Sequence, residues 1–112
     1  MAEREEERRA RNEALFREVN ERISEVIAHM ATAVPSERIE VLCECGSEDC
    51  IATLALTRTE YELVRSAPEQ FVVIPGHEIL HVEAVVAKTD RYEIVRKRGE
   101  DAAIARETDP RA

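Results

Sequence analysis

Residues 3 to 34 carry a helical pattern of apolar and charged positions, and the segment contains neither Gly nor Pro. Acidic and basic residues four apart recur in it, as in Glu5 with Arg9, and such pairs stabilise a helix. Pro35 disfavours helical geometry at the residue that precedes it. The pattern therefore predicts one long helix from about Glu3 to Val34.

The apolar positions of this helix begin late and form a seam with alternating spacings of three and four. Its members are Phe16, Val19, Ile23, Val26, Met30 and Ala33, broadened by Leu15, Ile27 and Val34. One interpretation is an amphipathic helix whose seam lies on the protein's own sheet. The other is a helical hairpin or coiled coil with a second copy, although the seam spans only about two and a half heptads. A helix of about 30 residues is about 45 Å long, whereas a domain of this size has a radius of gyration of about 13 Å. The charged first turns of the helix are therefore expected to project into solvent or to meet a partner.

Beyond Pro35 the pattern changes to short elements. Alternating or continuous apolar runs predict strands at 38–43, 51–56, 71–74, 82–88 and 92–97, the last two joined as a hairpin. Thr57 with Glu60 is a capping-box pattern, which predicts a helix that ends near Ala67. A last short helix is predicted from Glu100 to about Glu107.

These elements predict an α+β fold. Residues 1–34 form the long, partly projecting helix, residues 35–108 form a small mixed domain, and residues 109–112 form a charged tail. The chain has 112 residues, of which only 4% are aromatic and none is Trp. A core built from Val, Ile, Leu and Ala is therefore expected.

Charge and hydropathy exclude several classes of function. The net charge of −8 disfavours nucleic-acid binding, although Arg96-Lys97-Arg98 offers one small basic stretch. No apolar run approaches the roughly 20 residues of a membrane span. The N-terminus is charged where a signal peptide would be apolar, which indicates a cytoplasmic protein.

The three cysteines lie within eight residues of one another, as Cys43, Cys45 and Cys50 in a C-x-C-x4-C pattern. Three thiols cannot all pair in disulfides, and a cytoplasmic chain keeps its thiols reduced. A tetrahedral Zn²⁺ site takes four ligands, commonly three Cys and one His. His77 follows Pro75-Gly76, a turn that can present it to the thiols.

We therefore predict a structural zinc site formed by Cys43, Cys45, Cys50 and His77. The alternatives are free thiols without a metal, an iron–sulfur centre, or a redox-active thiol pair. The acidic neighbours Glu44, Glu48 and Asp49 disfavour a nucleophilic thiol, which needs a positive environment. 

A second motif competes for the same histidine, because residues 77–81 read His-Glu-Ile-Leu-His. On a helix, His77 and His81 would share one face and bind Zn²⁺, with Glu78 as the general base of a metallopeptidase. Pro75-Gly76 directly before the motif and the strand-like residues after it argue against such a helix. On a strand the two histidines would lie about 13 Å apart. A zinc peptidase would also need a third ligand downstream. Glu100 and Glu107 are the candidates, and no pattern singles out either of them.

The segments CECGSEDC, LTRTEYELVR, VIPGHE and DRYEIV, together with a preceding helix like RNEALFREVNERI, resemble a group of small uncharacterised bacterial proteins. The resemblance covers most of residues 11 to 110. It implies that the recurring features are the three cysteines and the His of the Pro-Gly-His-Glu turn. A His at the position of His81 does not belong to that pattern, and the group has no established activity.

The sequence therefore predicts a zinc-binding interaction or regulatory module without catalytic activity. Its N-terminal helix is expected to bind a second copy or another protein, and neither a membrane nor nucleic acid is expected as a partner. His29, on the long helix, is expected to face solvent.

Overall fold

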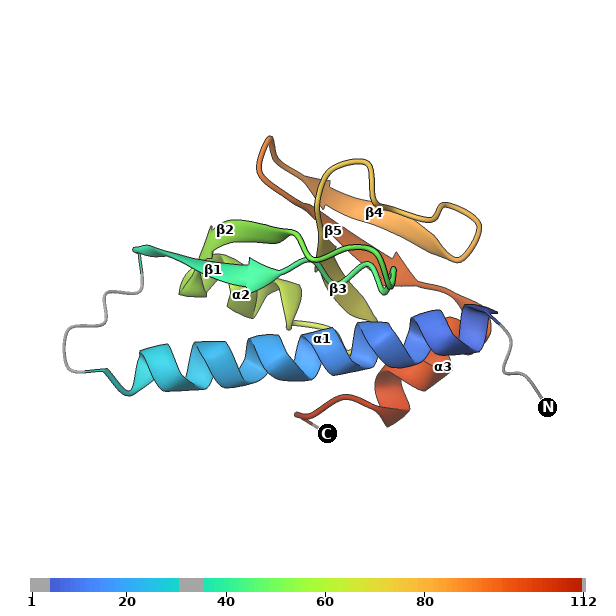
Figure 1. Cartoon of the computed structure of the whole chain (residues 1–112), viewed down its shortest axis with the longest axis horizontal. Helices are drawn as coiled ribbons and strands as arrows, with labels where there is room; N and C mark the ends of the chain where they lie inside the picture. Colours follow the sequence, from blue (N-terminus) through green and yellow to red (C-terminus); the bar gives the residue numbers. More distant parts are fainter. Residues whose placement is uncertain (1–4, 31–35, 112) are drawn as a thin grey trace.

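A computed structural model describes residues 5–30 and 36–111 of the chain, which over this range form three helices and five strands (Figure 1). The elements, in order, are α1 (Glu5–Ala28), β1 (Arg38–Leu42), β2 (Thr53–Thr57), α2 (Arg58–Val64), β3 (Gln70–Val73), β4 (Glu83–Lys88), β5 (Glu93–Lys97) and α3 (Gly99–Glu107). The fold is α+β, as the sequence predicts. 

The strands form two small antiparallel sheets, one of β1 and β2 and one in the order β3-β5-β4. β1 pairs with β2 so that Val41 lies opposite Leu54, and the side chains of both point into the core. The N–H of Glu44, just after β1, donates to the carbonyl of Val72 in β3 at 2.8 Å. This hydrogen bond joins the end of the first sheet to the middle of β3.

The core between the elements is mainly aliphatic, with residues such as Leu56, Val72 and Val95 fully buried. It is not purely aliphatic, because Tyr61, Phe71 and Tyr92 are buried as well. The expectation of a core built only from aliphatic residues is therefore incomplete, because most of the few aromatic residues are part of the core.

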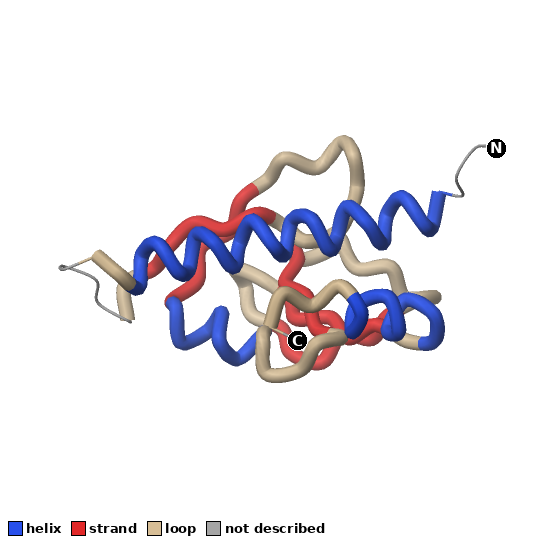
Figure 2. Tube along the Cα trace, turned by 90° about the horizontal axis from the view of Figure 1, so that it is seen from below, coloured by secondary structure: helices blue, strands red, loops and turns tan. Residues whose placement is uncertain are grey.

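Helix α1 runs along the whole molecule, beneath β1 and beside α3 (Figures 1 and 2). Its buried face is made largely of polar side chains: Ala10, Glu13, Arg17, Asn20, Glu21 and Ser24. Much of its apolar seam faces outward instead: Leu15, Val19, Val26 and Met30 are exposed, whereas Phe16, Ile23 and Ile27 are half-buried. The interpretation in which the apolar seam is the buried face of an amphipathic helix on the protein's own sheet is therefore wrong, because the fully buried residues of α1 lie on its polar face.

Ion pairs and hydrogen bonds hold the polar face of α1. Glu13 pairs with the buried Lys97 of β5, which also pairs with Glu83 of β4. The guanidinium of Arg17 is fully buried, lies 4.4 Å from the centre of the Phe71 ring and donates to the Ala105 carbonyl at 2.7 Å. Since buried polar and charged groups need hydrogen-bonding partners, these contacts fix the position of α1.

The ends of the helices differ from the sequence prediction in two places. α1 ends at Ala28, six residues before the expected Val34, and residues 31–34 lie outside the described range. α2 ends at Val64 rather than near Ala67. 

Several local predictions are confirmed. Thr57 and Glu60 form the capping box that begins α2, with each side chain bonded to the backbone N–H of the other residue. His29 is exposed. Strands β4 and β5 form the expected hairpin, closed by a 2.8 Å hydrogen bond from Thr89 N–H to the Tyr92 carbonyl.

The small basic stretch Arg96-Lys97-Arg98 does not form a common basic patch. Lys97 is buried between two carboxylates, while Arg96 pairs with Glu69 at 3.4 Å. Among the helices of the described residues, none combines the length and the apolar character needed to cross a membrane.

Candidate metal centre

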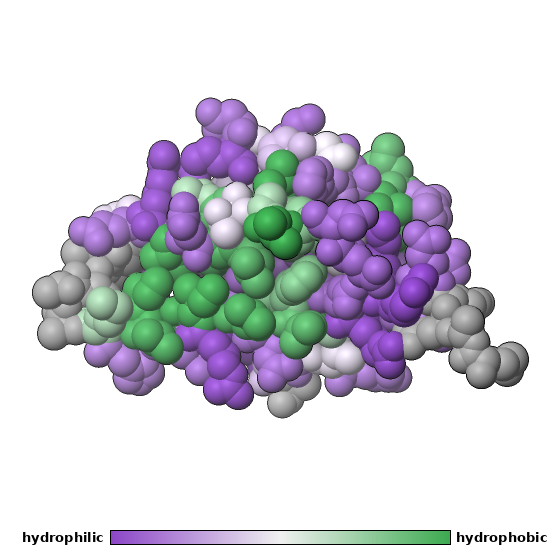
Figure 3. All heavy atoms as spheres, in the orientation of Figure 1, coloured by the Kyte–Doolittle hydropathy of each residue, from purple (hydrophilic) through white to green (hydrophobic). Residues whose placement is uncertain are grey.

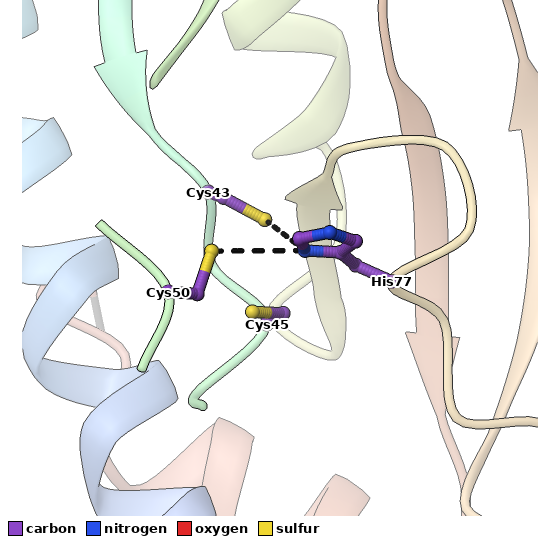
Figure 4. A group of neighbouring side chains, drawn as sticks. All are labelled: Cys43, Cys45, Cys50 and His77. Atoms are coloured by element: carbon purple, nitrogen blue, oxygen red, sulfur yellow. Dashed lines mark hydrogen bonds between the residues drawn. The ribbon is translucent and has the colours of Figure 1, made fainter. Parts of the chain in front are cut away.

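Three separate segments bring the predicted ligands together (Figure 4). Cys43 and Cys45 follow β1, Cys50 lies just before β2, and His77 follows β3. One ligand atom from each of the four residues lies within 4.8 Å of all the others. The cluster can hold a metal ion.

The distances suit a tetrahedral ion. His77 Nδ1 lies 3.6 Å from Cys43 Sγ and 3.6 Å from Cys50 Sγ. Around Zn²⁺, with metal–sulfur bonds of about 2.3 Å and a metal–nitrogen bond of about 2.0–2.1 Å, tetrahedral angles separate sulfur from nitrogen by about 3.6 Å. The donor set and its spacing are therefore compatible with zinc, and Nδ1 of His77 is the ring nitrogen that faces the thiols.

A tight turn presents His77 to the thiols. His77 N–H donates to the Ile74 carbonyl at 2.9 Å, and Pro75 and Gly76 occupy the two central positions. Gly76 has a φ of 95°, which a type II turn requires at its third residue and which Gly adopts without strain. The Pro-Gly-His order thus has a direct geometric role.

The loop that carries Cys45 is packed against α1. Gly46 has a φ of 77°, and a Cβ there would lie 2.6 Å from both the Arg9 carbonyl and the Glu13 Cγ. Arg9 donates to the Cys45 carbonyl at 3.1 Å, and Asn12 donates to the Gly46 carbonyl at 3.2 Å. Only a residue without a side chain allows this close approach between loop and helix.

Glu44, between the first two cysteines, points away from the thiols into the core. Its carboxylate accepts hydrogen bonds from Asn20, Tyr61 and the Val72 N–H, at 2.7, 3.1 and 3.0 Å. Burial raises the pKa of Glu44, while these donors favour its ionised form. The Glu44 side chain therefore connects the segment between Cys43 and Cys45 to α1, α2 and β3, and it is not part of the ligand cluster.

The protonation states of the Cys43 and Cys45 thiols depend on each other. A hydrogen bond from Cys43 lowers the pKa of Cys45 to about 4, and the same bond together with burial raises the pKa of Cys43. The backbone N–H of Ile74 also donates to Cys43 Sγ at 3.2 Å, a contact that stabilises a thiolate. A divalent cation among the sulfurs favours the thiolate form of all three, because its charge offsets theirs.

The competing His-Glu-x-x-His motif lacks the geometry that it needs. Residues 77–82 form loop and turn, so His77 and His81 do not share a helical face. His77 joins the thiols, whereas His81 is exposed and outside the cluster. The Glu78 carboxylate accepts a hydrogen bond from Gly76 N–H at 2.9 Å and so supports the turn.

No protein-family model matches the chain, and searches of curated proteins and of solved structures find no match either.

The residues that support the ligands were missed in the sequence. Arg9, Asn12 and Asn20 lie 22 to 36 positions away from the backbone groups that they contact. One signal was present, because the polar residues of α1 also recur at spacings of three and four. The apolar seam is the more obvious candidate for a buried face, so the polar seam does not by itself reveal which face of the helix is buried.

Proposed function

We propose that this protein is a zinc-binding interaction module without catalytic activity, in which one metal ion stabilises the fold and α1 binds a second copy or another protein. The observation that carries the proposal is the convergence of three thiols and one imidazole within 4.8 Å. 

A structural role for the metal follows from the number of donors. Three thiolates and one imidazole fill the four positions of tetrahedral Zn²⁺, which leaves none for substrate or water. Catalytic zinc sites instead keep one position open. The ligands come from the ends of β1 and β3 and the start of β2, so the ion would connect both sheets.

A binding role for α1 follows from the orientation of the helix. Its polar face is already engaged with the rest of the protein, while Leu15, Val19, Val26 and Met30 of its apolar seam are exposed. Figure 3 shows hydrophobic side chains gathered over the C-terminal half of α1 and the adjoining β1 region. Contiguous apolar surface of this kind marks interaction sites in proteins. The reduced thiols of such a module suit the cytoplasm, which we propose as its compartment.

Zinc content measured on purified protein tests the metal site. The expected result is one zinc per chain, lost in Cys45→Ser and retained in His81→Ala, since His81 lies outside the cluster. Retention of zinc by Cys45→Ser, or its loss in His81→Ala, would contradict the assignment. Chelator-sensitive proteolysis that disappears in Glu78→Gln would instead establish a metallopeptidase.

A further inference from the structure

The four proposed ligands differ in their access to solvent. Cys43 is 1% and Cys45 is 4% exposed, whereas Cys50 and His77 are not buried. An open cavity of about 330 Å³ borders the cluster. The residues that line it are Arg9, Cys45, Ser47, Asp49, Cys50 and His77. A small solute that enters this cavity therefore meets the sulfurs of Cys45 and Cys50 before it meets that of Cys43.

The strand register brings the same two cysteines together. The N–H of Cys43 donates to the Ala52 carbonyl at 3.0 Å, so the β1–β2 ladder continues into the cysteine segment. Counted onward in that register, Cys45 comes opposite Cys50, and their Sγ atoms lie within 4.8 Å of each other. Opposite residues on antiparallel strands have Cα atoms about 4.5–5.5 Å apart, which falls within the range of about 4.4–6.8 Å found in disulfides.

The two other pairs of thiols are less suited to a disulfide. Cys43 and Cys45 are alternate residues of one segment, and in extended chain such residues lie about 6.6 Å apart, at the upper limit of the disulfide range. Cys43 and Cys50 are diagonal neighbours in the register, which lie about 7–8 Å apart. Cys43 Sγ also accepts the Ile74 N–H at 3.2 Å, which holds it in place.

We propose that Cys45 and Cys50 form a disulfide when the protein meets hydrogen peroxide, and that this bond releases the zinc ion. The proposal rests on the proposed zinc site and adds its regulation. The Cys50 thiolate attacks one peroxide oxygen, becomes a sulfenic acid and expels hydroxide. The Cys45 thiolate then attacks the Cys50 sulfur, so that the S–S bond forms and a second hydroxide leaves. The two sulfurs thus lose two electrons, and the peroxide that accepts them becomes two hydroxide ions.

The charges at the cavity are compatible with this chemistry. Arg9 brings a positive charge to the cavity, which favours the thiolate form that reacts with peroxide. Of the acidic neighbours Glu44, Glu48 and Asp49, only Asp49 lines the cavity, and Arg9 offsets its charge. The acidic residues of the cysteine segment therefore suppress the reactivity of Cys50 less than the sequence alone suggests.

Loss of the metal follows from the number of donors that remain. With Cys45 and Cys50 joined, only Cys43 and His77 are left, and two donors do not complete the tetrahedral set of Zn²⁺. Reduction of the disulfide by a dithiol returns both thiolates and restores the site. Disulfides in cytoplasmic proteins are commonly transient and redox-sensing, which fits a bond that forms and is reduced again. 

Treatment of the zinc-loaded protein with hydrogen peroxide tests the proposal. A chromogenic chelator follows the release of zinc, and mass spectrometry maps the disulfide after alkylation of the remaining thiols. The expected result is loss of one zinc per chain, with Cys45 linked to Cys50 and with Cys43 alkylated. Dithiothreitol is expected to restore zinc binding.

A variant that keeps the donors but not the disulfide separates the two roles of Cys50. Cys50→His leaves two Cys and two His, a donor set that also binds zinc. This variant is expected to retain zinc at a peroxide concentration that empties the wild-type protein. His81→Ala is the control, because His81 lies outside the cluster, and it is expected to lose zinc as the wild type does.

Other results would overturn the proposal. Retention of zinc by the peroxide-treated wild type, or its release with Cys43 in the disulfide or with no disulfide, would each do so. Release from Cys50→His as fast as from the wild type would show that the disulfide is not the cause, and if this variant binds no zinc, the wild-type map decides. A reduced wild-type protein that binds no zinc would overturn the proposed function, while the disulfide map of the same sample still decides the pairing of Cys45 with Cys50.

Discussion

The side-chain amide of Asn20 forms both hydrogen bonds that an additional strand would offer to Leu42: its Oδ1 accepts from the Leu42 N–H at 2.8 Å, and its Nδ2 donates to the Leu42 carbonyl at 2.9 Å. The same Nδ2 donates to Glu44 at 2.7 Å. A helix thus completes the edge of β1 beside the cysteine loop, and one side chain supplies the contact.

Asn20→Ala is expected to destabilise the protein by about 3 kcal/mol, because it leaves the N–H and carbonyl of Leu42 without their partner and removes one of three donors to the buried Glu44 carboxylate. Urea unfolding measures this loss. The control is Asn12→Ala, which removes a single, partly buried hydrogen bond to Gly46 and should cost less than about 1.5 kcal/mol. Equal losses in the two variants would contradict the role given to Asn20.

Gly46→Ala is expected to cost several kcal/mol and to weaken zinc binding, because the new Cβ would collide with the backbone of α1 at 2.6 Å. Gly99→Ala is the matched control. Gly99 also has a positive φ, of 57°, but a Cβ there meets nothing within 4 Å, so only the backbone penalty of about 1–2 kcal/mol applies. Thermal unfolding and zinc titration compare the two, and similar effects would refute the close packing of loop and helix.

Removal of the proposed zinc ion with a chelator is expected to loosen the N-terminal half of α1, since Arg9 and Asn12 hold the helix to the Cys45–Gly46 backbone. Hydrogen exchange should accelerate in α1 and in residues 43–50 and change little in the β4–β5 hairpin. Faster exchange confined to residues 43–50 would show that α1 does not depend on the centre.

The pair of Glu13 and Lys97 predicts a pH effect. Burial raises the pKa of Glu13 to about 8, although the Lys97 ammonium lowers it. The folded protein then binds more protons than the unfolded chain between about pH 4.5 and pH 8, so Glu13 makes stability fall as pH rises through that window. Glu13→Gln should remove this contribution, with a difference in slope of up to about 1.4 kcal/mol per pH unit. 

Urea unfolding of wild type and Glu13→Gln at several pH values between 5 and 8 measures the difference. Glu62→Gln is the control, because Glu62 pairs with Arg111 at the surface and its pKa is lowered rather than raised. Parallel pH profiles for wild type and Glu13→Gln would contradict the shifted pKa.

The local elements of the fold could be predicted because their signals are local. The capping box of Thr57 and Glu60 acts over three residues, and the Pro-Gly-His turn acts over four. The C-x-C-x4-C pattern likewise indicates thiolate ligands directly. The residues of the candidate site could therefore be predicted without knowledge of the fold.

The orientation of α1 could not be predicted in the same way. The hydrophobic pattern favours burial of Val19 and Val26, whereas the structure buries Glu13 and Arg17. Burial of these polar side chains requires hydrogen-bonding partners, which are Lys97 for Glu13 and the Ala105 carbonyl for Arg17, and both partners are more than 80 residues away in the sequence. Contacts between residues so far apart in the sequence produce no periodic pattern from which they could be predicted.

The four proposed ligands have a final consequence for the chain before it folds. Cys43 and His77 are 34 residues apart, so a metal ion bound to both closes a long loop. In the chain-entropy treatment of a disulfide, a loop of this size corresponds to about 4 kcal/mol taken from the freedom of the unfolded chain. A metal ion would thus give this small protein the covalent restraint of a secreted domain in a form that needs no oxidant and can be withdrawn.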